Sequence, residues 1–308
     1  MKSKIGKMSL VLILLFFVFF YWLDYATSAD ANFVSYSVGL KTEKVRTHDL
    51  TNGFHDKRLD RIVEYAALCD IVYREGKKAN VDTLDNWKRI LIPMENIEPK
   101  DKNRKVLEGL YYELWELNEG DETIVAIVFR GTSQLSDWSA NLRWFRRVFD
   151  KKTWDHYDQL NKISGTIIDS IKKRNSVNTS LKIVATGHSL GGGLAQFMAY
   201  STPEINHVYA FDPSPVTGYY DIGAKDRNHN KKDAVIFRIY ESGEALSFAR
   251  KFMTILYPAP LIKTKDPALI RVRLSFSTAK DALKQHSMTE LAGNLRNYKE
   301  NENFQIKE

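Results

Sequence analysis

Hydrophobic residues along most of the chain fall in short runs that are typical of buried strands. WKRILIP and GLYYELWEL read as strands and are followed by the more continuous apolar runs TIVAIVFRG, LKIVAT, HVYAFDP, AVIFRIYES and IRVRLSF. Before these runs, Arg58 to Glu75 carries apolar residues at helical spacing, and so does the segment NKISGTIIDSIKKR, which lies between TIVAIVFRG and LKIVAT. Strands of antiparallel character thus lead into alternating strands and helices. This order predicts one α/β domain with a mostly parallel sheet flanked by helices.

The amino-terminal segment is predicted to direct export or to anchor the chain in a membrane. Three lysines near the start precede an uninterrupted apolar run from Met8 to Leu23, and small residues follow it. This layout is typical of a signal peptide cleaved after Ala29, although the run could also serve as an uncleaved anchor. We assign residues 1–29 to this segment, residues 30–57 to a polar linker or arm, and residues 58–308 to the folded domain. Either alternative places the domain outside the cytoplasm, as a periplasmic, secreted or membrane-anchored protein.

Composition narrows the function classes further. The formal net charge of +7 is spread along the 308 residues, which argues against a dedicated nucleic-acid binder and allows a mild attraction to anionic lipid. Cys69 is the single cysteine, so an intramolecular disulfide and a thiol-ligated metal site are both excluded.

The segment Ile183 to Phe197, IVATGHSLGGGLAQF, carries the strongest chemical signal. A buried strand precedes Ser189 and a helix follows it, the arrangement that lifts a serine hydroxyl above the edge of a sheet. Gly187 and Gly191 remove the Cβ atoms that would clash at so sharp a bend. A phosphate-binding loop would need a lysine after the glycines, and the sequence has none there. The context therefore predicts Ser189 as a nucleophile.

A serine nucleophile needs an imidazole to accept its proton and a carboxylate to orient that imidazole. The histidines that follow Ser189 are His207, His229 and His286. His207 opens the next strand, too near the elbow to turn back over it, and His229 lies in a polar stretch. His286 follows the last strand, where a returning loop can bring it over the carboxyl edge of the sheet. His286 is therefore the predicted base.

Acidic residues at two strand ends are candidates for the orienting carboxylate. Glu244 is the first choice, because a turn at Gly243 would present it at the tip of a loop. Asp212 is the second choice, since the proline after it also suits a carboxylate that caps a turn. Glu241, still within its strand, is the third.

The oxyanion hole requires two backbone N–H groups directed at the developing negative charge. One is expected from Leu190, directly after the nucleophile. The other is expected from Thr132 in VAIVFRGTSQLSD, whose hydroxyl could also help to hold the site. The glycine before Thr132 would equally suit an ordinary tight turn.

Three stretches in this order, VFRGTSQLSDWSANL, GHSLGGGLA and HSM, together resemble the class 3 lipase family of α/β-hydrolases. The likeness extends from about Arg58 to Leu295. It implies an α/β-hydrolase fold and the hydrolysis of carboxylic esters of lipids. It also implies water as the second nucleophile, without a metal or another cofactor.

The resemblance also assigns roles to individual residues. The family's oxyanion residue matches Thr132, its serine matches Ser189, and its histidine matches His286. The family's acid is usually an aspartate, and the corresponding stretch here is GEALS, which matches the acid to Glu244.

A basic aromatic segment, Asp137 to Trp154, is the candidate lipid contact. Its aromatic and basic side chains suit either a lid or rim at an anionic lipid surface, or a core-facing helix with a solvated basic side. The residues expected to contact lipid are Trp144, Phe145, Arg146 and Arg147.

Taken together, the sequence predicts an exported serine ester hydrolase of the lipase or phospholipase type, with a lipid ester as its substrate. Two alternatives stay open. One is a catalytically inactive hydrolase fold that serves as a binding module, although the serine, histidine and oxyanion residues argue against it. The other is a serine peptidase on the same fold.

Overall fold

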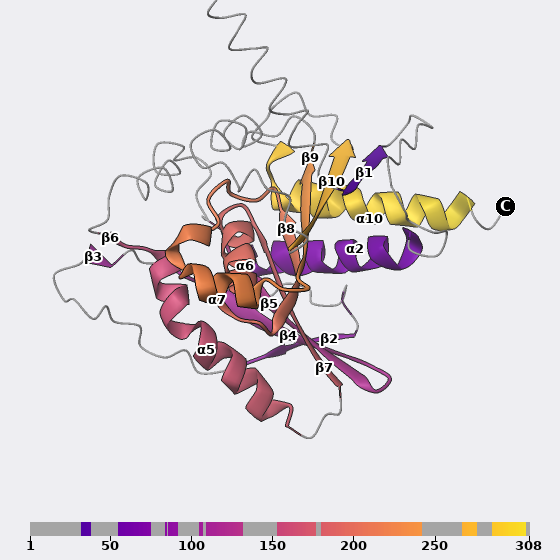
Figure 1. Cartoon of the computed structure of the whole chain (residues 1–308). Coiled ribbons are helices and arrows are strands. Elements are labelled where there is room, and N and C mark those ends of the chain that lie inside the picture. The colour runs from indigo at the N-terminus through magenta and orange to yellow at the C-terminus, as the bar shows by residue number, and fades with distance from the viewer. Residues whose placement is uncertain are drawn as a thin grey trace, which may run out of the picture.

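The computed structural model describes residues 32–37, 55–74, 84, 86–91, 105–106, 109–131, 153–176, 180–241, 267–275 and 285–305. Eight strands form a central sheet in the order β1–β10–β9–β8–β7–β5–β4–β2 (Figure 1). Their bounds are β1 (Asn32–Ser37), β10 (Ala268–Ser275), β9 (Val235–Glu241), β8 (Ile205–Phe211), β7 (Ser180–His188), β5 (Glu122–Phe129), β4 (Tyr112–Glu119) and β2 (Trp87–Ile90). Following this order across the sheet, the strands β1, β10, β9, β8, β7 and β5 are each parallel to the next. Strand β4 runs antiparallel to both β5 and β2. The expected mostly parallel sheet with antiparallel leading strands is confirmed.

Helices cover both faces of this sheet (Figure 1). One face carries α2 (His55–Ile71), the short helix η1 (Val72–Arg74) and α10 (Met288–Gln305), and the other carries α5 (His156–Arg174), α6 (Leu190–Ser201) and α7 (Ala224–Asn230). The remaining elements are β3 (Lys105–Val106), β6 (Thr153–Trp154), which pairs with it, and η3 (Tyr219–Asp221). This is the three-layer architecture of an α/β-hydrolase.

Helices α2 and α10 are joined by polar contacts as well as by apolar packing. The Thr289 hydroxyl donates to Asp70 at 2.6 Å, and Lys299 Nζ lies 2.7 Å from an oxygen of Asp60. Asp70 also pairs with Arg74, which ends η1. The Asp60 pair joins one end of the two helices, and the Asp70 contacts fix the end of α2 and η1 against the start of α10 at the other end. That end of the helix pair lies near the carboxyl edge of the sheet.

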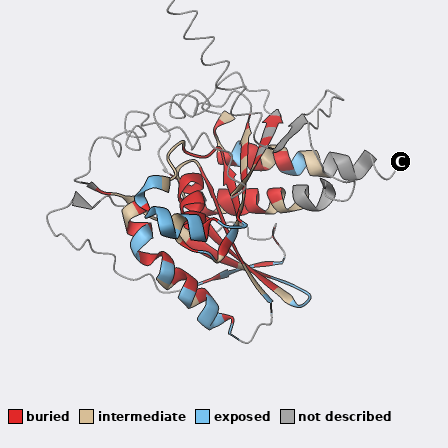
Figure 2. Cartoon of the chain, in the orientation of Figure 1, coloured by how far each residue is buried: buried red, intermediate tan, exposed pale blue. Residues whose placement is uncertain are grey.

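Helix α5 begins where its sequence provides a capping box. The Asp155 side chain accepts from the N–H groups of Tyr157 and Asp158, and the Asp158 side chain accepts from the Asp155 N–H. Its apolar stripe faces the sheet and its polar side faces solvent, as Figure 2 shows. The helix leads into β7 and so places the start of the strand that carries the elbow.

The amino-terminal boundary differs from the sequence-based expectation. Residues 30–57 were expected to be a linker or arm, but Asn32–Ser37 forms β1, parallel to β10 at the edge of the sheet. Helix α2 also begins at His55 instead of Arg58. A six-residue edge strand gains its stability from a partner more than 200 residues away, so local pattern alone does not reveal it.

No helix in the described part of the chain is long and apolar enough to cross a membrane. Residues 1–29 lie outside the described residues. The signal peptide or anchor therefore stays a prediction.

Candidate active site

The site lies at one edge of the sheet because four neighbouring strands run in parallel. The carboxyl ends of β5, β7, β8 and β9 lie side by side, with Phe129 opposite Gly187 and His188 opposite Phe211. Side chains just beyond such strand ends gather in one place. Here they include Ser189 after β7 and Asp212 after β8.

Ser189 occupies a strained turn between β7 and α6. Its backbone has φ 57° and ψ −121°, a conformation that non-glycine residues rarely adopt. Its N–H donates to the Phe211 carbonyl at 3.0 Å, and its carbonyl accepts from Ser214 at 2.8 Å and from Gly193 at 3.2 Å. Three hydrogen bonds thus hold the turn. The strand–turn–helix arrangement expected around Ser189 is present.

The glycines beside Ser189 allow the backbone segments to approach closely. A Cβ added at Gly187 would clash with the backbone of Gly191. A Cβ added at Gly191 would clash with the Phe129 carbonyl oxygen and lie 2.9 Å from its carbon. Both positions therefore require glycine for steric reasons, although neither has a positive φ.

Replacing Gly191 by alanine is expected to lower the free energy of unfolding by about 3 kcal/mol, because overpacking forces the backbone apart. Gly165→Ala in α5 is the matched control. A Cβ at Gly165 would meet nothing within 4 Å, so alanine should stabilise the helix by up to about 1 kcal/mol. Urea denaturation of both variants measures the two effects. Equal stabilities would contradict the close packing at the elbow.

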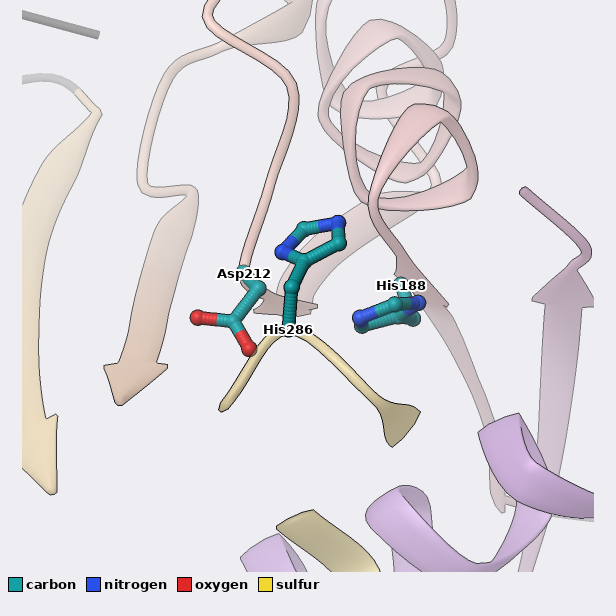
Figure 3. A group of neighbouring side chains, drawn as sticks. All are labelled: His188, Asp212 and His286. Carbon is teal, nitrogen blue, oxygen red and sulfur yellow. The ribbon is translucent and has the colours of Figure 1, made fainter. Parts of the chain in front are cut away.

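Three buried side chains gather beside the elbow (Figure 3): His188 from the end of β7, Asp212 from the end of β8, and His286 from the turn before α10. One nitrogen or oxygen of each lies within 4.8 Å of the others. The exposed fraction is 0 % for Asp212 and 2 % for each histidine. The predicted base and the second-choice acid are thus brought together.

The backbone holds Asp212 in a defined position. Its φ is 37°, in the left-handed region that aspartate tolerates better than most residues. Its N–H donates to the Ile239 carbonyl at 2.7 Å, and its Oδ1 accepts from the Glu241 N–H at 3.1 Å. The neighbouring strand β9 therefore fixes both the backbone and the carboxylate of Asp212.

Of the remaining predicted site residues, the structure describes Leu190. Leu190 begins α6, where the first N–H groups of a helix have no partner within the helix and can bind an anion. The other predicted site residues lie outside the described residues: Thr132, Trp144, Phe145, Arg146, Arg147 and Glu244. Within the described part of the chain, no hydrogen bond joins the Ser189 hydroxyl to His286. Such contacts often tighten only in the substrate complex.

The same cluster offers donors that a metal ion could use. Two imidazoles and a carboxylate are ligands of Zn²⁺ in many proteins. However, His188 Nδ1 lies 3.0 Å from the hydroxyl of Tyr73, and Ser189 follows His188 directly on the elbow. An aspartate, a histidine and a serine form a hydrolytic site without a metal. Asp212 and His286 therefore also suit a role beside Ser189.

Two residues at this site were not expected from the sequence. His188 is buried beside His286, with ring centroids 4.8 Å apart. Burial lowers the pKa of His188 well below its usual value, the nearby His286 lowers it further, and the His286 backbone partly opposes this. Tyr73 comes from η1, 115 residues before His188. His188 could have been noted as the neighbour of Ser189, but no local signal points to Tyr73.

A model of the phospholipase-like family, described as a Tle-like phospholipase domain, matches residues 64–229, a little over half of the chain. The chain belongs to this family. Membership confirms the inferred lipase-like α/β-hydrolase family and makes the protein a hydrolase of lipid esters. The matched range of this phospholipase-like protein includes Ser189 and Asp212 and ends before His286.

Solved lipases and esterases show a more distant likeness. Lip2 lipase from Yarrowia lipolytica is 16 % identical, with 63 % of this chain and 74 % of that chain covered and a TM-score of 0.40. A triacylglycerol lipase from Penicillium expansum is 12 % identical, with coverages of 77 % and 89 % and a TM-score of 0.42. A Pyrobaculum calidifontis esterase is 10 % identical, with coverages of 82 % and 96 % and a TM-score of 0.33. TM-scores this low say nothing about the site or substrate. A search of curated proteins gives no match.

Proposed function

We propose that this phospholipase-like protein cleaves carboxylic esters of phospholipids through an acyl-enzyme on Ser189. The observation that carries the proposal is the strained Ser189 turn beside the buried pair Asp212 and His286. Asp212 replaces the sequence-based first choice, Glu244, because Asp212 lies beside His286, whereas the place of Glu244 is not described.

In the first step, the Ser189 hydroxyl attacks the ester carbonyl carbon while His286 accepts its proton. The carbonyl oxygen becomes an oxyanion, which accepts hydrogen bonds from the N–H groups of Leu190 and Thr132. Asp212 orients the imidazole and stabilises its charged form. The tetrahedral intermediate collapses, the bond to the alcohol oxygen breaks, and His286 returns its proton to the leaving lysophospholipid.

In the second step, water attacks the acyl group on Ser189 and gives its proton to His286. The second tetrahedral intermediate releases the fatty acid, and the proton on His286 returns to the Ser189 oxygen. The net reaction consumes one water for each ester bond. No oxidant, reductant or cofactor enters this balance.

The test of this proposal is a substrate panel for the purified protein. It compares vesicles of phosphatidylcholine and phosphatidylglycerol, a triacylglycerol emulsion, a soluble short-chain ester and a chromogenic peptide. We expect fatty acid release from phospholipid and hydrolysis of the soluble ester. Peptide cleavage alone would support the peptidase alternative, and binding to vesicles without cleavage would support the inactive module.

Two variants extend the same panel to the proposed membrane contact. Replacing Trp144 and Phe145 by serine should reduce activity on vesicles and spare the soluble ester, since interfacial binding follows apolar area at about 25 cal/mol per Å². Replacing Arg146 and Arg147 by glutamine should reduce activity only on phosphatidylglycerol and only at low salt. Equal losses on both substrates with a lowered melting temperature would instead place these residues in the core.

Export is part of the proposal, on the basis of the lysines and the apolar run in residues 1–29. Amino-terminal sequencing of the protein from a cell fraction outside the cytoplasm should begin at Asp30. A full-length chain confined to the cytoplasm would contradict export.

A further inference from the structure

A single hydroxyl group lies between the ends of two strands at the site. The Gly131 N–H donates to the Tyr73 hydroxyl oxygen at 3.1 Å, and that oxygen lies 3.0 Å from His188 Nδ1. It also lies 3.4 Å from the His188 carbonyl oxygen. Gly131 directly precedes the predicted oxyanion residue Thr132, and His188 directly precedes Ser189. Tyr73 therefore joins the backbone next to Thr132 to the backbone next to the nucleophile.

The Gly131 hydrogen bond has a fixed direction, whereas the bonds between Tyr73 and His188 follow from the tautomer of the imidazole. Burial lowers the pKa of His188 well below its usual value, so the imidazole is neutral and one ring nitrogen can accept. Burial raises the pKa of Tyr73, so its hydroxyl keeps its proton at neutral pH. Tyr73 accepts from the Gly131 N–H. In one tautomer of His188 it donates its proton to Nδ1, and in the other it accepts from the Nδ1–H and donates to the His188 carbonyl oxygen, so both tautomers keep it bound to His188. The bonds form a chain from Gly131 through Tyr73 to His188.

The sheet itself does not hold this part of the two strands together. Pairing between β5 and β7 ends at Phe129 and Gly187, so Gly131 lies beyond the ladder. Beyond that point, Gly131 still lies close to the backbone of His188 and Ser189. A Cβ added at Gly131 would clash with the Tyr73 hydroxyl, and it would lie 2.6 Å from the His188 carbonyl oxygen and 3.3 Å from Ser189 Cβ.

We propose that Tyr73 is a positioning residue whose hydroxyl, bound to Gly131 and His188 at once, fixes the oxyanion segment, here Gly131 and the predicted oxyanion residue Thr132 that follows it, against the nucleophile elbow. This inference rests on the proposed hydrolysis at Ser189. Oxyanion donors act only when they are held close to the position of the developing charge. A small outward shift of the segment would therefore weaken the transition state more than it weakens substrate binding.

The test compares Tyr73→Phe with Tyr65→Phe. Each removes one hydroxyl from a tyrosine on the same side of the sheet, and Tyr65 packs in the core against Trp87 and Tyr209. On the soluble ester, Tyr73→Phe should lower kcat by about 10-fold or more with KM within about twofold, since losing an oxyanion donor outright costs 10² to 10³. The rate of serine labelling by a fluorophosphonate should fall in parallel. Tyr65→Phe should leave kcat and labelling unchanged.

A second pair of variants tests the other end of the chain of hydrogen bonds. Asparagine at position 188 can place an amide group near the position of Nδ1, where it can accept from the Tyr73 hydroxyl or donate to it, whereas leucine can do neither. His188→Asn should therefore retain more activity than His188→Leu at similar melting temperatures. Equal activity of these two variants would overturn the role of the hydrogen bond between Tyr73 and position 188.

The remaining outcomes separate this inference from the proposed function. A wild-type protein that cleaves esters, together with Tyr73→Phe at wild-type kcat, would overturn the positioning role alone. So would an equal loss in Tyr65→Phe. A wild type that neither cleaves esters nor reacts with the fluorophosphonate would overturn the proposed function. Amide hydrogen exchange tests the bond between Gly131 and Tyr73 in a way that needs no enzymatic activity. Faster exchange at the Gly131 amide in Tyr73→Phe supports the positioning role, and unchanged exchange overturns it.

Discussion

Replacing Ser189 by alanine is expected to abolish ester hydrolysis and fluorophosphonate labelling together. Loss of the nucleophile of a triad lowers kcat by about 10⁶-fold in a well-studied serine protease, so we expect at least about 10⁴-fold here. The reason is that only a hydroxyl beside a suitable base reacts readily at neutral pH. Alanine keeps the backbone hydrogen bonds that hold the turn, so the variant should fold.

Labelling is read by mass spectrometry of the modified peptide and activity by fatty acid release. Ser201→Ala is the matched control, because the Ser201 hydroxyl donates to the Met198 carbonyl at the far end of α6. It should label and hydrolyse like the wild type. Modification of another serine, or hydrolysis by Ser189→Ala, would refute the assignment of the nucleophile.

Asp212→Asn is expected to cause the second large loss, about 10⁴-fold in kcat, as for the orienting aspartate of a serine protease. Asparagine can still accept the Glu241 N–H through its amide oxygen, so the backbone of the site should keep its place. What it loses is the negative charge that stabilises the imidazolium of His286 during the reaction.

The comparison variants are Glu244→Gln and Glu241→Gln, assayed beside Asp212→Asn with melting temperatures. We expect both to keep most of their activity. If Glu244→Gln is the crippling change and Asp212→Asn is mild, the acid comes from the loop after β9, as the class 3 lipase resemblance implied.

The turn around Ser189 could be predicted because its determinants are local. The apolar strand, the glycines and the following helix stand together in one short stretch, and the structure has them in that arrangement. The central strands were predictable for the same reason, since continuous apolar runs mark strands buried on both faces.

The acid could not be chosen from sequence alone. Asp212 and Glu244 both follow strands that end at the same edge of the sheet, so the pattern makes both plausible partners for a histidine. What distinguishes Asp212 is the positive φ and the hydrogen bond from the Glu241 N–H, which place its carboxylate beside His286. These features depend on the packing of β8 against β9.

Tyr73 and β1 were beyond sequence reasoning for a related cause. The partners of Tyr73 lie 58 and 115 residues away, and β1 pairs with β10 at the other end of the chain. No short-range pattern encodes either contact. Only the folded structure shows that Tyr73, in the short helix η1, contacts His188 at the end of β7.

The direction of β1 determines where on the domain an amino-terminal anchor would be attached. Because β1 runs parallel to β10 and so to β7, its first residue, Asn32, lies at the edge of the sheet opposite Ser189. The apolar run ends at Leu23, nine residues before Asn32, a reach of at most about 30 Å. An uncleaved anchor would therefore attach the domain at the edge of the sheet away from Ser189, through a tether of that length. Such a form would reach its own membrane only by turning on this tether, whereas cleavage after Ala29 would remove that restriction.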